Sequence, residues 1–201
     1  RPAHAGSGRR SVRSETRNPV QRVPARMDPA DGDDGTDDPD DSAATGGGTT
    51  RSGTFLVTAA DEGSAVLRDV DGGGVYALAD NPGLAAGETV VGTVAPVPPL
   101  ETAWRLVETE GRYRVTVEAS DEAPTADARG LVPETVGEVT RTERAGEGEL
   151  HVLAVPDDGT DSAVTDVLDD EEGLRARASR LGVRRVEVRS TPGVVSVRYL
   201  P

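Results

Sequence analysis

Short runs of β-branched and apolar residues, each closed by Gly, Pro, Asp or Asn, constrain the fold of this chain more than any other feature. From Gly53 onward these runs recur about every ten residues, a spacing typical of short strands joined by tight turns. Gly92 lies inside one run and predicts a bend or bulge there. The runs predict six strands in the first part of the chain, over 54–58, 64–70, 75–78, 88–97, 103–108 and 112–118. We expect a small antiparallel β-barrel of the OB or SH3-like kind, with an open antiparallel sheet as the alternative.

The pattern changes after residue 120 to a mixture of helical and strand periods. Residues 150–155 are apolar apart from His151 and predict a strand in the centre of its sheet. Thr160 is placed to cap one helix, and the spacing of Asp169 and Glu172 fits a capping box for the next. Further elements are expected as a short helix over 125–131 and strands over 183–190 and 194–200. The fold class is therefore α+β, with a barrel-like domain over 51–120 followed by a small α+β domain over 121–201.

Residues 1–50 form a separate region in composition. Residues 27–50 carry eight Asp and no aromatic side chain, so they cannot bury enough apolar surface to offset the entropy of ordering, and we expect a disordered arm. Residues 1–26 carry seven Arg and one Glu. The only Met, Met27, stands at the change of composition and predicts the natural start of translation; a basic nucleic-acid-binding arm is the alternative for residues 1–26.

The charge balance predicts the environment of the protein. The chain has 36 acidic residues against 22 basic ones, all of them Arg. An acidic surface without Lys resembles the proteins of extreme halophilic archaea, in which salt screens the repulsion between carboxylates; an acidic protein from a high-GC actinobacterium is the alternative. Cysteine is absent, which excludes disulfides and thiolate chemistry. No apolar run of about 18 residues occurs, so we expect no membrane span and a cytoplasmic location.

Catalytic chemistry has little support in the sequence. The two histidines are His4, in the arm, and His151, which is expected to be a hydrogen-bonded structural residue. The carboxylates between 157 and 172 lack the spacing of an EF-hand and predict a hydrated face instead of a metal site. No phosphate-binding loop or nucleophile motif joins a strand to a helix. We expect no enzyme, no catalytic residue, no metal and no cofactor.

The C-terminal segment is the one basic part of the ordered chain. Residues 173–201 hold seven Arg and a single acid, Glu187. Guanidinium groups bind carboxylates and phosphates through paired donors, so the candidate anion- or partner-binding residues are Arg184, Arg185, Arg189 and Arg198. Three interpretations are open: pairing with the acidic run 157–172, a phosphate-facing surface for RNA or DNA, or an acidic protein partner. The expected function is a non-enzymatic binding or adaptor module, with a nucleic-acid-binding accessory protein as the alternative.

Several segments also resemble a haloarchaeal family known as domain of unknown function 5812. They are Gly53-Thr-Phe-Leu-Val-Thr, Ala65-Val-Leu-Arg-Asp-Val-Asp, Asn81-Pro-Gly-Leu, Arg144-Ala-Gly-Glu-Gly-Glu-Leu-His-Val-Leu and Val194-Val-Ser-Val-Arg-Tyr-Leu. The resemblance covers residues 53–201. It implies a haloarchaeal cytoplasmic protein and brings no activity or site residue with it.

Overall fold

The computed structural model describes residues 49–99, 102–144 and 146–201. The predicted disordered arm and the predicted start at Met27 lie outside these residues, apart from Thr49 and Thr50. Ten strands and three α-helices follow in the described part. The strands of the first half are β1 (Arg51–Ala60), β2 (Ala65–Asp69), β3 (Val75–Leu78), β4 (Glu88–Pro96) and β5 (Trp104–Arg114). The second half holds β6 (Thr116–Ala119), α1 (Ala126–Gly130), β7 (Val139–Glu143), β8 (Glu149–Ala154), α2 (Thr160–Asp169), α3 (Glu171–Arg180), β9 (Arg185–Thr191) and β10 (Val194–Leu200).

The first five strands form the closed barrel that the turn spacing predicted. Their order around the barrel is β1-β2-β3-β5-β4, and β1 closes the barrel by pairing with β4. All neighbours are antiparallel except β3 and β5, which meet in parallel at Leu78 and Trp104. Phe55, Tyr76 and Trp104 stack edge to face in the interior, with ring centroids 5.6 and 4.8 Å apart. Three of the five aromatic residues of the chain thus fill one small core.

The prediction of six barrel strands was wrong by one. The expected turn at Glu110 and Gly111 does not form, because β5 continues through it and stays paired with β4. Gly92 of β4 lies where the register between β4 and β5 shifts, and a Cβ there would lie 2.2 Å from the carbonyl oxygen of Glu108 on β5. The predicted bulge at Gly92 is therefore confirmed. The strand expected over 112–118 divides at Val115, which is fully buried in the core of the second sheet.

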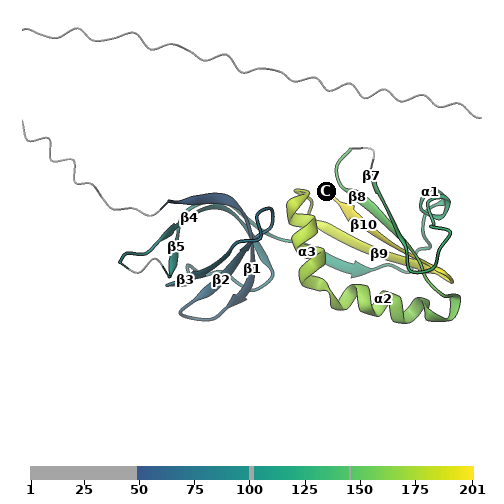
Figure 1. Ribbon diagram of the computed structural model, residues 1–201, viewed down its shortest axis with the longest axis horizontal. Helices are drawn as coiled ribbons and strands as arrows, with labels where there is room; N and C mark the ends of the chain where they lie inside the picture. Colours follow the sequence, from purple (N-terminus) through teal and green to yellow (C-terminus); the bar gives the residue numbers. More distant parts are fainter. Residues whose placement is uncertain (1–48, 100–101, 145) are drawn as a thin grey trace, which may run out of the picture. The chain divides into compact units, whose positions relative to one another are not determined.

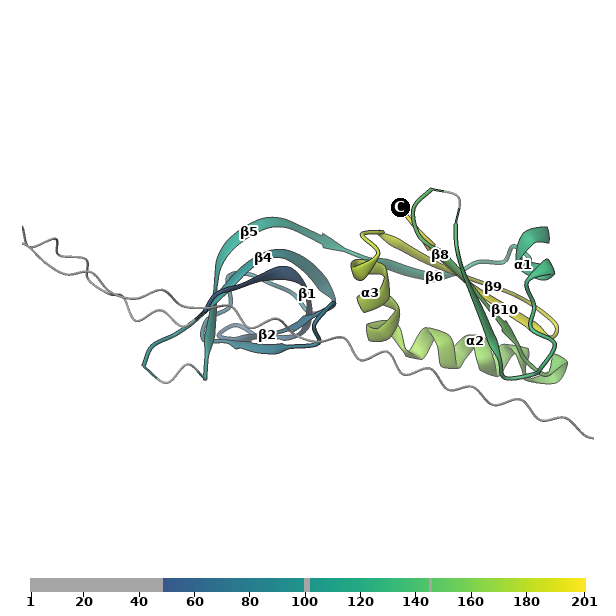
Figure 2. The same cartoon turned by 45° about the horizontal axis from the view of Figure 1, so that its top comes forward.

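The second sheet has five strands in the order β6-β9-β10-β8-β7. Its strand β8 has a neighbour on both sides, as the apolar run 150–155 predicted. Helices α2 and α3 cover one face (Figure 1), where Val186, Val188, Val195 and Val197 pack with Leu174 of α3. The short helix α1 lies on the opposite face (Figure 2), where Ala128 packs on β8. Most of that second face carries no helix, and we refer to it as the helix-free face.

The helix ends differ from two of the sequence predictions. Thr160 does not cap α2, since it is the first helical residue; its hydroxyl donates to the carbonyl oxygen of Asp157 and accepts from the N–H of Gly193. The cap of α3 is Asp170, whose carboxylate accepts from the N–H of Gly173, instead of Asp169 paired with Glu172. The short helix over 125–131 is confirmed as α1, with Thr125 as its cap.

Helix α3 also contacts the barrel. All of the described residues belong to one compact unit. The hydroxyls of Thr89 on β4 and Ser179 on α3 lie 2.7 Å apart in a buried position, and Leu56 and Val70 form a small apolar cluster with Ala176. One helix therefore belongs to the cores of both halves of the described chain.

In the described part of the chain, no helix has the length and apolar character that crossing a membrane requires.

Candidate functional site

The helix-free face carries a row of side chains that runs across all five strands of the second sheet. Strand pairing places Glu118 of β6 beside Glu187 of β9, Glu187 beside Arg198 of β10, Arg198 beside Leu150 of β8, and Leu150 beside Thr142 of β7. Because side chains alternate between the two faces of a sheet, these five lie on the same side. The row thus joins charged groups at the β6 edge to an apolar and hydroxyl end at β7.

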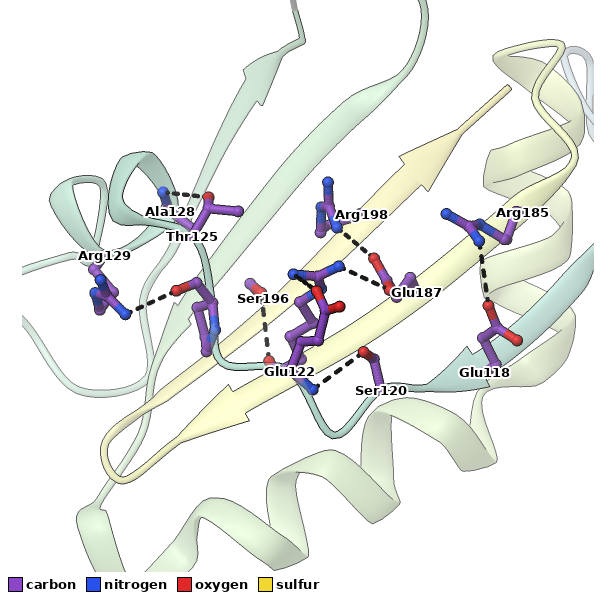
Figure 3. A network of polar contacts seen from close by, with 12 residues as sticks. Glu118, Ser120, Glu122, Thr125, Ala128, Arg129, Arg185, Glu187, Ser196 and Arg198 are labelled. Carbon is purple, nitrogen blue, oxygen red and sulfur yellow. Dashed lines mark hydrogen bonds and ion pairs between the residues drawn. The ribbon is translucent and has the colours of Figure 1, made fainter.

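Glu187 is the centre of an ion-pair network in this row (Figure 3). Its two carboxylate oxygens bind Arg189 at 3.0 Å and Arg198 at 2.5 Å, and only 8% of its side chain is exposed. Burial on its own would raise the pKa of Glu187, but the hydrogen bond from Arg189 and the charges of Arg198 and Arg189 outweigh it and lower the pKa. Arg189 also binds Glu122 at 2.6 Å. Two carboxylates and two guanidiniums are therefore held together, and their charges cancel.

The four predicted site residues do not form one cluster. Arg185, Arg189 and Arg198 share the helix-free face, and Arg185 pairs with Glu118 at 3.7 Å. Arg184 precedes β9 and lies over the ring of Tyr113, 4.6 Å from its centroid. Internal pairing, one of the three interpretations left open by the sequence, therefore occurs, but with carboxylates outside the run 157–172. The ion pairs of these arginines within the described residues involve Glu118, Glu122 and Glu187, whereas Glu171 and Glu172 of the acidic run bind Arg175 and Arg68.

A cavity of about 310 Å³ opens on the helix-free face at the β7 end of the row. Leu131 and Leu150 form its apolar wall, while Arg144 and Arg198 lie on the charged side. The remaining lining residues are Thr125, Asp127, Thr142 and Glu143. Apolar walls with a few polar groups are typical of a ligand site. Of the four arginines predicted from the sequence, only Arg198 reaches this cavity.

Strand β7 forms one edge of the second sheet and borders the cavity. The N–H of Arg144 donates to the carbonyl oxygen of Gly148, and that of Ala154 donates to the carbonyl oxygen of Glu138. In an antiparallel pair, the residues between two such positions alternate in direction. The backbone groups of Val139, Arg141 and Glu143 therefore point away from β8, toward the open edge.

Two exposed valines lie at the other end of this edge. Val136 is 60% exposed and Val139 is 42% exposed. The edge therefore offers backbone donors and acceptors in the middle, apolar side chains at its start and a cavity at its end.

His151 lies on the helix-covered face, opposite the cavity. Its Nε2 is 2.8 Å from a carboxylate oxygen of Glu149, which also accepts a hydrogen bond from Nε of Arg177 at 3.0 Å. Burial lowers the pKa of His151 more than the neighbouring Glu149 raises it. The imidazole is thus neutral near pH 7 and hydrogen-bonded, as its position in an apolar strand predicted.

Strand β7 was the part of the site that sequence reasoning missed. From Thr140 to Glu143 it alternates β-branched and charged side chains, and it lies between two glycines with positive φ, Gly137 and Gly146. That alternation is the signal that could have predicted it. Among the described residues, no group of three or more His, Asp or Glu has the arrangement to hold a metal ion.

The fold and the site define a class of protein in which a small closed barrel is followed by a mixed sheet with its two longer helices on one face. A family model described as a family of unknown function (DUF5812) matches residues 51–190, and the chain belongs to this family. Neither the curated proteins nor the solved structures gave a match.

Proposed function

We propose that this protein is a non-enzymatic binding module that takes up an extended segment of a partner protein as an additional strand beside β7. The observation that carries this proposal is the outward direction of the backbone groups of Val139, Arg141 and Glu143. An extended peptide can satisfy those groups with its own backbone, which supplies affinity, while pockets for alternate side chains supply specificity. The edge at the other side of the sheet, β6, has only four residues.

The cavity indicates which side chain such a segment would carry. A strand added next to β7 continues the row Glu118–Glu187–Arg198–Leu150–Thr142, so one of its side chains lies beside Thr142 and enters the cavity. Leu131 and Leu150 favour an apolar side chain there, and the charges at the rim favour polar residues on either side of it. The exposed Val136 and Val139 provide a second apolar contact along the edge.

The nucleic-acid alternative has weaker support from the geometry. Binding to nucleic acid depends on basic side chains that are free to neutralise phosphates. Arg185, Arg189 and Arg198 are each within 3.7 Å of a carboxylate oxygen in the described structure, so a phosphate would have to compete with those carboxylates.

The barrel also gives little support to nucleic-acid binding. We infer that it is of the OB type, because its five strands close in the order β1-β2-β3-β5-β4 with β3 parallel to β5. In OB folds, the surface of strands β2 and β3 and the nearby loops bind oligonucleotides. Here the loop between β1 and β2 is Asp61-Glu-Gly-Ser, and Arg68 on β2 is bound to Glu172 at 3.0 Å. The two carboxylates of this loop would repel phosphate, and Arg68 is already paired.

Two substitutions at one position test the proposal. Val139→Pro removes the outward N–H, and no ladder hydrogen bond to β8 is lost because that N–H points away from β8. Val139→Ala also replaces the valine side chain but keeps the backbone N–H, so it is the matched control. The tagged full chain, in both variants and in the original sequence, is used to capture partners from a lysate of the organism that makes it, with and without nuclease.

The expected result is a nuclease-resistant protein partner that Val139→Ala retains and Val139→Pro loses. A synthetic peptide from that partner should then protect the amides of Val139, Arg141 and Glu143 from hydrogen exchange. Capture of nucleic acid alone would favour the alternative function. A partner bound equally by both variants would contradict strand addition.

We also propose that the protein works in the cytoplasm of an extreme halophile. This proposal is supported by the 36 acidic residues against 22 basic ones, and by the absence of Lys and Cys. The chain should then unfold when KCl is lowered well below about 1 M, because carboxylate repulsion is no longer screened. Thermal melting at a series of KCl concentrations measures this, and equal stability in dilute buffer would contradict it.

A further inference from the structure

A second cavity, of about 220 Å³, lies on the helix-covered face of the sheet and plays no part in the proposed strand addition. It is lined by Arg141 of β7, His151 of β8 and Tyr199 of β10, together with the N-cap Asp170 and three residues of α3, namely Gly173, Leu174 and Arg177. Four elements therefore bring two guanidiniums, an imidazole and a phenol to one small space.

The buried phenol of Tyr199 is the most unusual group in this cavity. Only 3% of Tyr199 is exposed, and within the described residues its hydroxyl makes no hydrogen bond, although it lines the cavity. The ring is enclosed by its neighbours, whereas the hydroxyl is accessible from the cavity, where it can bind a ligand or water. Burial raises the pKa of Tyr199 to about 12, which keeps the hydroxyl protonated and able to donate.

The second uncommitted donor is the guanidinium of Arg141. No ion pair or hydrogen bond of its side chain occurs among residues 49–99, 102–144 and 146–201. Most arginines of the same residues are bound to a carboxylate, a carbonyl oxygen or an aromatic ring; Arg177, for instance, binds Glu149. Arg141 therefore projects its full set of donors toward the cavity and the solvent.

The carboxylates near the cavity are already engaged. Glu149 accepts from Arg177 and His151, and Asp170 accepts from the N–H of Gly173 at the start of α3. These contacts engage the two carboxylates, which therefore make no bond to Arg141 or to the hydroxyl of Tyr199. The first turn of α3, a helix of ten residues, adds the positive end of its dipole.

We propose that this cavity is a binding site for a small oxyanion, a phosphate or carboxylate group, held by the guanidinium of Arg141 and the hydroxyl of Tyr199 against the first turn of α3. A guanidinium and a phenol are both donors, and an oxyanion has acceptors only, so the two match. A volume of about 220 Å³ is large enough for such a group. The ligand is then a small metabolite or the terminus of a larger molecule.

The two possible sources of the oxyanion are tested separately, with inorganic phosphate in one titration and acetate in the other. The full chain is labelled for NMR, and the ring signals of His151 and Tyr199 are followed at constant pH and KCl. Saturable shifts of both rings are expected with at least one anion. Phosphate alone would indicate a phosphorylated ligand, and acetate alone a carboxylate ligand.

Three variants assign the effect to the site. Arg141→Ala and Tyr199→Phe each remove one donor and should weaken binding at least about tenfold, the loss expected for one hydrogen bond to a charged group. Arg51→Ala, at the exposed start of β1 in the barrel, is the control and should bind like the original chain. Melting curves confirm that each variant is folded. The proposal is overturned if neither anion gives a saturable shift, or if Arg141→Ala and Tyr199→Phe bind as tightly as the control.

Discussion

Replacing Glu187 with Gln should cost far more stability than the same replacement at Glu122, although both carboxylates bind Arg189. The Glu122 contact is the shorter, at 2.6 Å against 3.0 Å for Glu187. The difference lies in burial. The side chain of Glu187 is 8% exposed and that of Glu122 is 72% exposed.

The expected magnitudes follow from the charge that each substitution leaves behind. Without the carboxylate of Glu187, Arg189 and Arg198 face each other with side chains only 12% and 18% exposed, and breaking such a buried pair costs about 3–5 kcal/mol. The amide of Gln can still accept one hydrogen bond, so we expect about 3 kcal/mol. Glu122→Gln breaks a pair whose carboxylate is screened by solvent, and it should cost less than about 1 kcal/mol.

Urea unfolding of the two variants at constant KCl measures both costs, because urea leaves the ionic strength unchanged. The dependence on urea concentration should stay the same, so that a shift of the midpoint reports stability alone. The reasoning would be refuted by equal costs at the two positions, or by a Glu187→Gln variant that loses less than about 1 kcal/mol.

The remaining predictions concern pH, a close backbone contact and the barrel core. The pKa values of Glu149 and Glu187 are lowered in the folded protein, so the unfolded chain takes up protons first as the pH falls. Their contribution to the free energy of unfolding should be complete above about pH 5 and decline below about 4.3, the pKa of free Glu. Acid titration followed by circular dichroism measures this decline. Gly148→Ala should destabilise more than Gly137→Ala in thermal melts: both glycines have positive φ, but only at Gly148 would a Cβ lie 2.1 Å from a carbonyl oxygen, that of Tyr199. Phe55→Ala should lose about 3–5 kcal/mol in urea unfolding, since Phe55 is fully buried among the barrel strands.

The barrel was predictable because its signals are local. Each strand ends at a turn whose residues are visible in the sequence, such as the glycines after Asp71, of which Gly73 has positive φ. The length of β5 was not predictable, because Glu110 and Gly111 are typical of a turn and only pairing with β4 keeps the strand extended through them. The position of β6 was not predictable either, since its partner β9 lies about seventy residues further along the chain.

The site was predictable only in part, for the same reason. The sequence indicated an arginine-rich C-terminal segment, and alternation places Arg185, Arg189 and Arg198 on one face. The two-residue turn at Pro192 and Gly193 also fixes the register that sets Glu187 opposite Arg198. The sequence could not indicate that Glu122, beyond the distant strand β6, binds Arg189. Strand β7 is an edge strand of five residues, of which only Val139 is apolar, so the sequence pattern that predicts a strand was weak there.

Hydrogen exchange of single amides along β7 tests the central claim, an open edge that accepts a partner strand, most directly. In the free protein, the amides of Thr140 and Thr142 should be protected by β8, and those of Val139, Arg141 and Glu143 should exchange rapidly. Addition of the partner's segment should then slow exchange at these three positions alone. Protection of all five amides in the free protein, or no change at the three outward amides in the complex, would contradict the account.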